Sequence, residues 1–476
     1  MLQDDMSAPG FEENLTRVLR SCFDDFDALH TVVRLSGGAS QETYKIEFSR
    51  GGKAHTVAMR RAPGGEYENP DPARPGLNVE ARLMQIAGAV GVPEPEVYRV
   101  LNLEDDLGAG FIMEWLDGET LGSRILKSPE LEEARPRLAR ECGQILARIH
   151  GIDPVESGLT KMLTTVTTEA FIRKMWEQYQ SYDTPQPMID YTARWLLAHI
   201  PPEGEPRLVH NDFRNGNLMV TPDGINAVLD WEVAHLGDPV RDIGWICTNS
   251  WRFGRTEKRV GGFGYLEDLL DGYEVESGIR IDPEHVHFWE VFGSFWWAAG
   301  CLKMADHWRH GPDPTVERPG VARRNSECQA DCVNLLIPGP VQLVDKVEPL
   351  SSQDTPRVDE LLISVRDFLR KDMRAATQGR ENFLALVASN SLDIVLRELS
   401  LSPQALMAEA VRLRQLLGCE GEVMALRWKL TQALRDGDLP LDHPGLAAHL
   451  RKTVINQLAI DQPRYSALAT ALSFEN

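Results

Sequence analysis

The stretch VHNDFRNGNL, residues 209–218, decides how this sequence is interpreted. It contains a His-x-Asp triplet, and an asparagine follows the aspartate five residues later. Eighteen residues beyond Asp212 comes a second stretch, VLDWE, at residues 228–232. Apolar, β-branched residues border both stretches, which indicates short strands separated by a loop. Such a loop brings Asp212 and Asn217 to one side, where they face Asp230 on the next turn.

Phosphoryl transfer explains why these residue types occur at this spacing. The reaction requires an acceptor hydroxyl to be held in line with metal-bound phosphates. One carboxylate accepts the proton of the hydroxyl. Mg²⁺ prefers oxygen ligands, which a second carboxylate and a neutral amide supply. The alternative is a chance Asp- and Asn-rich loop, and the agreement in order, spacing and strand context argues against it.

The two stretches resemble the catalytic loop and the metal-binding aspartate of kinases. Residues 30 to about 340 are similar to the aminoglycoside phosphotransferase and choline kinase group of the protein-kinase-like fold. Within that group they resemble most the phosphotransferase modules found beside, or fused to, acyl-CoA dehydrogenases. The resemblance implies an α+β bilobal fold with an antiparallel β N-lobe and a mainly helical C-lobe. It also implies ATP and Mg²⁺ as cofactors.

The same resemblance assigns roles within the catalytic loop. Asp212 is implied as the catalytic base, with Asn217 and Asp230 as the metal ligands. His210 and Asp242 are grouped with the catalytic residues as scaffold, because Asp242 is expected to brace the loop by hydrogen bonding through His210. Neither of these two is expected to transfer a proton.

Further residues match the kinase parts that hold a nucleotide. The segment VAMR, residues 57–60, matches the strand that carries the phosphate-contacting lysine, which Arg60 replaces. A guanidinium binds phosphates bidentately. Neighbouring residues of a strand face opposite ways, so only Arg60 or Arg61 points into the cleft, and we favour Arg60. Glu80 resembles the acidic residue that orients this cation, and an exposed helical glutamate is the alternative.

Two segments are expected to contact the nucleotide through their backbone. In SGGASQ, residues 36–41, Gly37, Gly38 and Ser40 stand where a Gly-rich loop covers the phosphates, because glycine lets N–H groups approach closely. Two glycines between strands by themselves indicate only a turn. The segment FIMEWL, residues 111–116, resembles the hinge between the lobes. Backbone groups at Glu114 and Leu116 are expected to pair with adenine, and a core strand is a compatible alternative.

The hydrophobic pattern predicts a helix over residues 12–29, then short strands and one helix, and then a mainly helical chain. We divide the sequence into four parts. Residues 1–115 form an N-terminal helix and the N-lobe, and residues 116–345 form the C-lobe. Residues 346–357 are a linker, and residues 358–476 form an all-α domain. Ser402-Pro403 predicts a helix start, whereas Gly418 and Gly437 predict helix ends. The last part resembles an uncharacterised helical domain. It is expected to dock on the kinase lobes, to gate the acceptor site or to form a homodimer.

Composition excludes several classes of protein. The 71 acidic and 50 basic side chains give a net charge of -21, which disfavours nucleic-acid and membrane-surface binding. Seven cysteines form no disulfide framework and fit small buried residues in a reducing compartment. The N-terminus lacks the apolar core of a signal peptide. The aromatic and apolar stretch at residues 291–304 is shorter than the ~20 residues of a membrane span and predicts a buried helix. These features predict a cytoplasmic protein.

The substrate is the least determined feature. Only 12 residues separate Asp230 from Asp242, which leaves no room for the long activation segment of a protein kinase. Basic side chains at residues 252–259 and 318–324 form either a solvated surface or a binding patch for an anionic acceptor. We therefore expect a hydroxylated metabolite, such as a hydroxyacyl-CoA, rather than an aminoglycoside. An antibiotic kinase and a catalytically silent nucleotide-binding scaffold are the alternatives.

Overall fold

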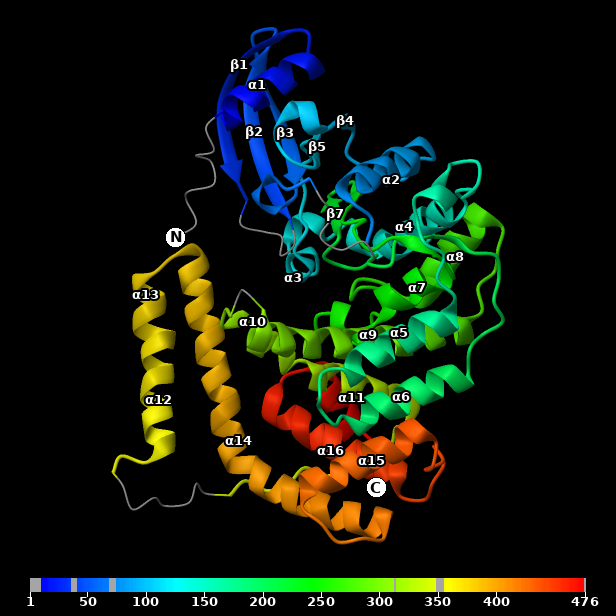
Figure 1. Ribbon diagram of the computed structural model, residues 1–476, viewed down its shortest axis with the longest axis vertical. Coiled ribbons are helices and arrows are strands. Elements are labelled where there is room, and N and C mark those ends of the chain that lie inside the picture. The colour runs from blue at the N-terminus through cyan, green and yellow to red at the C-terminus, as the bar shows by residue number, and fades with distance from the viewer. Residues whose placement is uncertain (1–9, 36–40, 68–73, 312–313, 348–354, 475–476) are drawn as a thin grey trace.

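The computed structural model of the protein describes residues 10–35, 41–67, 74–311, 314–347 and 355–474. It shows a small lobe built on a β-sheet, a larger helical lobe, and a helical C-terminal region beside the larger lobe (Figure 1). The α+β bilobal architecture and the all-α C-terminal region predicted from the sequence are thereby confirmed. Gly37, Gly38 and Ser40 lie outside the described residues.

The N-lobe is a five-stranded antiparallel sheet in the order β1-β2-β3-β5-β4. The strands are β1 (Phe26–Arg34), β2 (Glu42–Arg50), β3 (Lys53–Arg61), β4 (Val97–Val100) and β5 (Gly110–Glu114), and the helices are α1 (Phe11–Cys22) and α2 (Leu77–Ala89). The helix predicted over residues 12–29 ends earlier, at Cys22. Phe26 instead pairs with Arg50 across the sheet, so tertiary pairing overrides the helical pattern at its C-terminal end.

The C-lobe is mainly helical and carries two small two-stranded sheets, β6-β9 and β7-β8. Its helices are α3 (Gly122–Ile125), α4 (Arg135–His150), α5 (Thr168–Gln180), α6 (Pro187–Ala198), α7 (Val240–Cys247), α8 (Leu266–Ser277), α9 (Pro283–His310), α10 (Glu317–Ala322) and α11 (Asn325–Leu336). Its strands are β6 (Arg207–Val209), β7 (Leu218–Thr221), β8 (Gly224–Val228) and β9 (His235–Gly237). The aromatic stretch 291–304 lies within α9 and is largely buried, as predicted. Within the described part of the chain, none of the helices has the length and apolar character needed to cross a bilayer.

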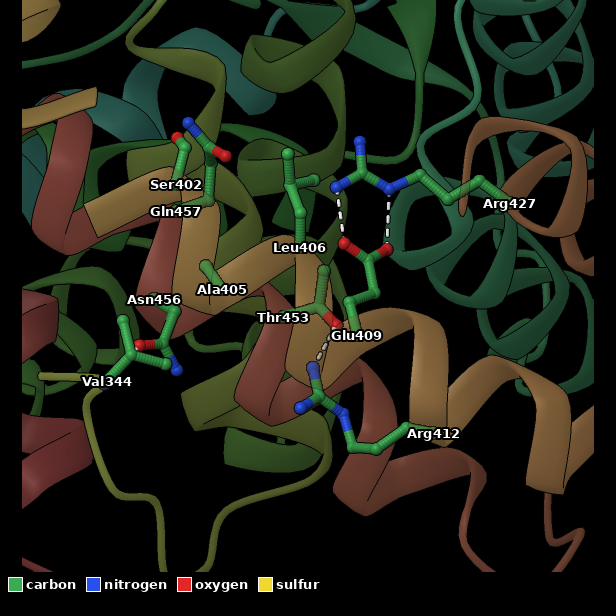
Figure 2. Close-up of a pocket in the computed structure, with 10 residues that line it drawn as sticks. All are labelled: Val344, Ser402, Ala405, Leu406, Glu409, Arg412, Arg427, Thr453, Asn456 and Gln457. Carbon is green, nitrogen blue, oxygen red and sulfur yellow. Dashed lines mark hydrogen bonds and ion pairs between the residues drawn. The ribbon is translucent and has the colours of Figure 1, made fainter. Parts of the chain in front are cut away.

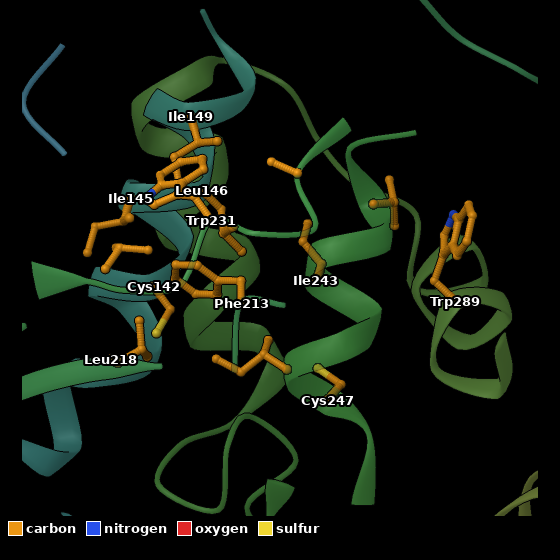
Figure 3. Packing of buried hydrophobic residues seen from close by; sticks show 14 of the residues in the cluster. Cys142, Ile145, Leu146, Ile149, Phe213, Leu218, Trp231, Ile243, Cys247 and Trp289 are labelled. Atoms are coloured by element: carbon orange, nitrogen blue, oxygen red, sulfur yellow. The ribbon is translucent and has the colours of Figure 1, made fainter. Parts of the chain in front are cut away.

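The two stretches 209–218 and 228–232 are each anchored in the core of the C-lobe by one aromatic residue (Figure 3). Phe213 and Trp231 are completely buried, and they pack with side chains of α4 and α7 such as Leu146 and Ile243. Truncating a buried aromatic side chain to alanine costs roughly 3–5 kcal/mol, so each anchor strongly stabilises its position. The aspartates next to them in sequence, Asp212 and Asp230, are thereby held at the surface of a rigid core.

The C-terminal region shares a hydrophobic core with the C-lobe. Its elements are α12 (Val358–Phe368), a π-helical turn (Leu369–Met373), α13 (Arg374–Ala376), α14 (Gly379–Leu417), α15 (Val423–Asp436), α16 (Leu446–Asp461) and α17 (Ser466–Leu472). Leu430 and Ile455 from this region belong to one cluster with Met188 and Val333 of the C-lobe. The region therefore docks on the kinase lobes, which is one of the three roles expected for it.

Helix α14 is continuous through Pro403, so the prediction of a new helix start at Ser402-Pro403 is wrong. A proline removes one helical hydrogen bond and kinks a helix more often than it ends it. Beside the missing bond, the Ser400 carbonyl accepts a hydrogen bond from the Val347 amide at 2.9 Å, and Leu401 is buried. Tertiary contacts therefore stabilise the uninterrupted helix. Gly418 and Gly437 do end their helices, with φ of 61° and 83°.

Polar side chains line a small cavity between α14, α15 and α16 (Figure 2). Its volume of about 20 Å³ has room for one water molecule. Glu409 is 3% exposed and forms a two-pronged ion pair with Arg427, which joins α14 to α15. Because its carboxylate is already paired and the cavity is water-sized, we regard this cluster as part of the helical packing.

Helix α12 leaves one apolar stripe in contact with solvent. Val358, Leu361, Val365 and Phe368 recur at helical spacing, and each is at least half exposed. This surface is compatible with the homodimer expected through residues 358–476, which stays a prediction.

Candidate active site

The catalytic loop connects β6 to β7 and takes an unusual backbone path. Asn211 and Asp230 have positive φ values of 66° and 74°, a region that non-glycine residues seldom adopt. Such conformations persist only where the surrounding structure compensates for them, and they cluster at functional sites. The nearby residues Phe213 and Trp231 are completely buried.

Asp212 is fixed by three hydrogen-bond donors. Its Oδ1 accepts from Trp245 Nε1 at 2.8 Å and from Arg214 Nε at 3.0 Å. Its Oδ2 accepts from Asn217 Nδ2 at 2.6 Å. The side chain is 18% exposed, so solvent still reaches a carboxylate whose orientation is set by the protein. This arrangement suits a base that must meet a hydroxyl in one geometry.

Asn217 and Asp230 lie just beyond the end of the small β7-β8 sheet. Leu218 pairs with Val228, and the Leu229 amide donates to the Asn217 carbonyl at 2.9 Å, which places Asp230 one residue further along. Because the Asn217 amide group donates to Asp212, its Oδ1 is turned toward other partners. Asn217 thus adjoins the Asp212 carboxylate, and Asp230 follows the residue that is hydrogen-bonded to Asn217.

The donor set fits Mg²⁺ bound together with a nucleotide. Within the described ranges, no three His, Cys, Asp or Glu side chains are grouped as a metal site of their own. Mg²⁺ is commonly held by one or two carboxylates and completed by substrate phosphates and water. Asp230 and Asn217 match that pattern, since they supply two oxygens and leave the remaining positions to the phosphates.

Arg60 links the two lobes through ion pairs. Its guanidinium contacts Glu80 Oε1 of α2 and Asp230 Oδ1 of the C-lobe, both at 2.7 Å. Arg61 points to the opposite face of the strand, where it contacts Glu42 Oε2 at 2.7 Å. The structure therefore places Arg60, and not its neighbour, beside Asp230, in the position that the strand alternation favours.

Glu80 is 1% exposed, which excludes the alternative of a solvated helical glutamate. Burial raises the pKa of its carboxyl to about 7, although the charge of Arg60 acts in the other direction. Gln41 completes this cluster, with its carbonyl accepting from Arg60 Nε and its amide 3.5 Å from Glu80 Oε2. Gln41 is the last residue of the segment 36–41 that is expected to cover the phosphates.

Asp242 braces the loop through His210, as expected, and the contact is made by the His210 backbone amide. Its two oxygens accept from the backbone amides of His210 and Asn211 at 2.8 and 2.7 Å. The ring that contacts it is that of His150, at 3.3 Å. Burial by itself raises the pKa of the Asp242 carboxyl, but the hydrogen bonds from His150 and the loop amide outweigh it and lower the pKa.

The His210 ring serves the loop in another way. Burial lowers its pKa, which keeps the imidazole neutral. Its Nδ1 accepts from the Asp212 amide at 3.2 Å, so Nε2 carries the proton and donates to the Leu229 carbonyl at 3.1 Å. His210 therefore bridges the residue preceding Asp230 to the backbone of Asp212.

The hinge residues lie where β5 leaves the N-lobe. The Glu114 amide donates to the Glu96 carbonyl at 2.8 Å, so this N–H is not available to a base. For the Leu116 amide, two residues on, no acceptor is found among the described residues. The expected contact of Leu116 with adenine is therefore compatible with the structure, and the Gly-rich loop lies outside the part described.

Sequence reasoning missed the residues that hold Asp212 in place. Arg214 follows it by only two positions, and that proximity within the motif was the available signal. Trp245 carries no signal of its own in the sequence, because a tryptophan of a helical lobe fits the core as well as the wall of a site.

Arg241 is completely buried among aromatic rings, with its guanidinium 4.9 Å from the ring centre of Trp245 and 4.7 Å from that of Trp296. Burial lowers the pKa of Arg241 to about 9.

The two basic groups do not form an open anion-binding patch. Arg252 and Arg259 both pair with the buried Glu290. In the second group Arg323 pairs with Asp461 at 2.6 Å, and Arg324 with Glu327 at 3.0 Å. Most of these cations are therefore neutralised within the fold, and the anionic-acceptor argument built on them fails.

Comparisons with known proteins agree with this geometry. Residues 31–279 match the model of the phosphotransferase enzyme family, and residues 375–465 match a domain of unknown function. A solved structure of a Ralstonia eutropha protein, described as an aminoglycoside phosphotransferase, has a TM-score of 0.55. It is 24% identical and covers 67% of this chain and 96% of that chain.

The curated relatives are multidomain proteins. Acyl-CoA dehydrogenase family member 10 of Mus musculus is 28% identical over 45% of this chain and 20% of its own length. The probable acyl-CoA dehydrogenase IBR3 of Arabidopsis thaliana is 27% identical over 63% of this chain and 38% of its own. The chain thus spans well under half of these relatives. Because the family model matches more than half of the chain, over the residues that build the cleft, the protein belongs to the phosphotransferase enzyme family.

Proposed function

We propose that the protein transfers the γ-phosphate of ATP to a hydroxyl of a small molecule, with Mg²⁺ as the metal. The single observation that carries this proposal is the arrangement of Asp212, Asn217 and Asp230. A solvent-accessible carboxylate, held by three donors, lies beside two oxygens suited to a nucleotide-bound metal.

Each of these side chains then has a distinct task. Asp212 accepts the proton of the acceptor hydroxyl, and Trp245 and Arg214 hold its carboxylate toward the acceptor. Asn217 and Asp230 would hold the metal, which neutralises charge on the phosphates when it is bound. Arg60 contacts the phosphates from the N-lobe side, because its guanidinium already lies beside Asp230.

A hydroxylated metabolite, such as a hydroxyacyl-CoA, is the proposed acceptor class. The curated relatives named as acyl-CoA dehydrogenases support this choice. The surroundings of the base support it as well, because the charged side chain in contact with Asp212 is the cation Arg214, and Trp251 lies next to it. A polycationic aminoglycoside requires acidic groups around the acceptor, so the antibiotic-kinase alternative is disfavoured.

Phosphate transfer from γ-labelled ATP to a panel of acceptors tests the proposal. The panel contains hydroxyacyl-CoAs, the corresponding free hydroxy acids, simple alcohols and aminoglycosides. We expect labelled product with the first class and none with Asp212→Asn, which keeps the size of the side chain but removes the base. Efficient transfer to aminoglycosides contradicts the proposed acceptor, and nucleotide binding with no transfer to any compound supports the silent scaffold.

A further inference from the structure

A short turn connects the C-terminal helices to the active-site wall. The 3₁₀ turn η6 (Asn249–Trp251) follows α7, and its first side chain is tied to the start of α17. Asn249 Nδ2 donates to Ser466 Oγ at 3.1 Å, and the Ser466 hydroxyl lies 3.2 Å from Asn249 Oδ1. Asn249 Nδ2 also donates to Asp331 Oδ1 at 2.7 Å, while Tyr465 donates to the other oxygen of Asp331 at 2.7 Å.

The other end of this turn packs against the catalytic base. Trp251 is 9% exposed, and its ring centre lies 5.0 Å from that of Trp245 in an edge-to-face contact. The Arg214 guanidinium lies over the face of Trp251, 4.3 Å from the ring centre. Trp245 and Arg214 are the two donors to Asp212 Oδ1. One aromatic ring thus supports both groups that orient this oxygen.

We propose that the C-terminal helical region, residues 358–474, is a working part of the phosphotransfer site, with Ser466 and Asn249 as positioning residues that hold Asp212 through Trp251. Figure 1 shows α16 of the C-terminal region beside α11, which carries Asp331. The inference rests on the proposed function. It adds to the proposed site a structural support from Ser466, which lies outside the residues 31–279 that match the family model. A displacement of about 1 Å at a reacting group costs on the order of 100-fold in rate, so a distant support affects turnover.

The chain of contacts is continuous and short. From the Ser466 hydroxyl to the Asp212 carboxylate it passes through Asn249, the turn and Trp251, and then through Trp245 or Arg214. Apart from the backbone of the turn itself, each link is a hydrogen bond or a ring contact between buried or half-buried groups. A role in packing alone requires only the apolar contacts of α17, such as those of Leu468, and not a polar tie to this turn.

Steady-state ATP turnover, measured as phosphate release or as transfer to an accepted hydroxyl compound, tests the inference. The variants are Ser466→Ala, Asn249→Ala and their combination. Ser466→Thr is the conservative variant, because it retains a hydroxyl. The matched control is Ser473→Ala, since that hydroxyl donates to Thr470 within the last turn of the same helix.

We expect Ser466→Ala and Asn249→Ala to lower kcat about three- to tenfold, the effect of losing one or two buried hydrogen bonds at a positioning group. KM for ATP stays within about twofold, because the nucleotide is held by other residues. The double variant is no slower than the slower single variant, since both changes break one link. Ser466→Thr and Ser473→Ala retain wild-type kcat. Unchanged kcat in Ser466→Ala and Asn249→Ala overturns the inference.

Amide hydrogen exchange provides a readout that needs no substrate. The amides of Trp251, Arg252 and Asn217 donate to local carbonyls at 2.9–3.0 Å. In Ser466→Ala, but not in Ser473→Ala, we expect faster exchange at these three amides. Unchanged exchange at all three overturns the inference. If the wild-type protein turns over no ATP, the proposed function fails, whereas the exchange result still decides whether α17 holds the turn and the catalytic loop.

Discussion

Replacing Arg60 with methionine tests whether the ion pair across the cleft compensates a buried charge. The methionine retains the length of the side chain but removes the contacts at 2.7 Å to Glu80 and Asp230. Glu80 is 1% exposed, so it then has no cation beside it. Removing one partner of a buried pair commonly costs about 3–5 kcal/mol, unless the remaining group becomes neutral.

Glu80 is able to become neutral, which makes the cost depend on pH. Its pKa of about 7 is above the ordinary value of 4.5, so the folded state binds this proton more tightly than the unfolded state. The contribution of this proton to the free energy of unfolding is therefore complete below about pH 4.5, and it is lost as the pH rises toward 7. For wild type, this loss between pH 6 and pH 8.5 amounts to about 1.4 kcal/mol. Without Arg60 the charge that lowers this pKa is gone, so the pKa moves further up, and each unit of that rise adds about 1.4 kcal/mol to the loss.

Urea unfolding in the presence of EDTA at pH 6 and pH 8.5 measures this difference. We expect Arg60→Met to be destabilised more at pH 8.5 than at pH 6, relative to wild type, by about 1.4 kcal/mol for each unit by which its Glu80 pKa exceeds that of wild type. The variant Arg60→Met/Glu80→Gln, which has no charge to compensate, serves as the control and loses the extra pH dependence. The reasoning is refuted if Arg60→Met is destabilised equally at both pH values.

The remaining predictions concern the base, a buried carboxyl and a paired cation. Asp230→Ala abolishes Mg²⁺-dependent ATP binding in calorimetry, whereas Asp212→Ala retains binding and loses about 100- to 10,000-fold in turnover; loss of ATP affinity in Asp212→Ala contradicts these roles. Burial raises the pKa of Asp331 to about 7, so its contribution to stability falls as the pH rises from about 4 to 7; Asp331→Asn makes the wild-type decline shallower over that range, and an unchanged slope contradicts the assignment. Arg323→Glu places a carboxylate against the buried Asp461 and lowers the free energy of unfolding by at least about 3 kcal/mol, with KM for the acceptor unchanged; a raised KM without destabilisation restores the anion-patch interpretation.

The sequence by itself was sufficient for the family, the bilobal fold and the grouping of the central side chains. Asp212 and Asn217 are five residues apart in one loop, and a two-stranded sheet brings Asp230 next to them. The alternation of side chains along a strand likewise predicted that only one of Arg60 and Arg61 faces the nucleotide side, and it favoured Arg60. In each case a short stretch of regular backbone determines which side chains face the same way, so spacing alone is informative.

Tertiary structure alone decided the partners of charged and polar groups. Asp242 contacts His150, which lies 92 residues away, and Arg323 contacts Asp461, which lies 138 residues away. A basic residue has the same appearance in sequence whether it faces water or a buried carboxylate. The sequence therefore suggested an anion patch, and the fold paired most of those cations internally.

The position of the C-terminal helices was likewise beyond the sequence. Their hydrophobic periodicity predicts helices with apolar faces but does not say which surface covers those faces. The fold supplies the partners in α6 and α11, carries α14 through Pro403, and brings Ser466 to Asn249. Periodicity is a property of neighbouring residues, whereas burial and pairing depend on which distant segments meet.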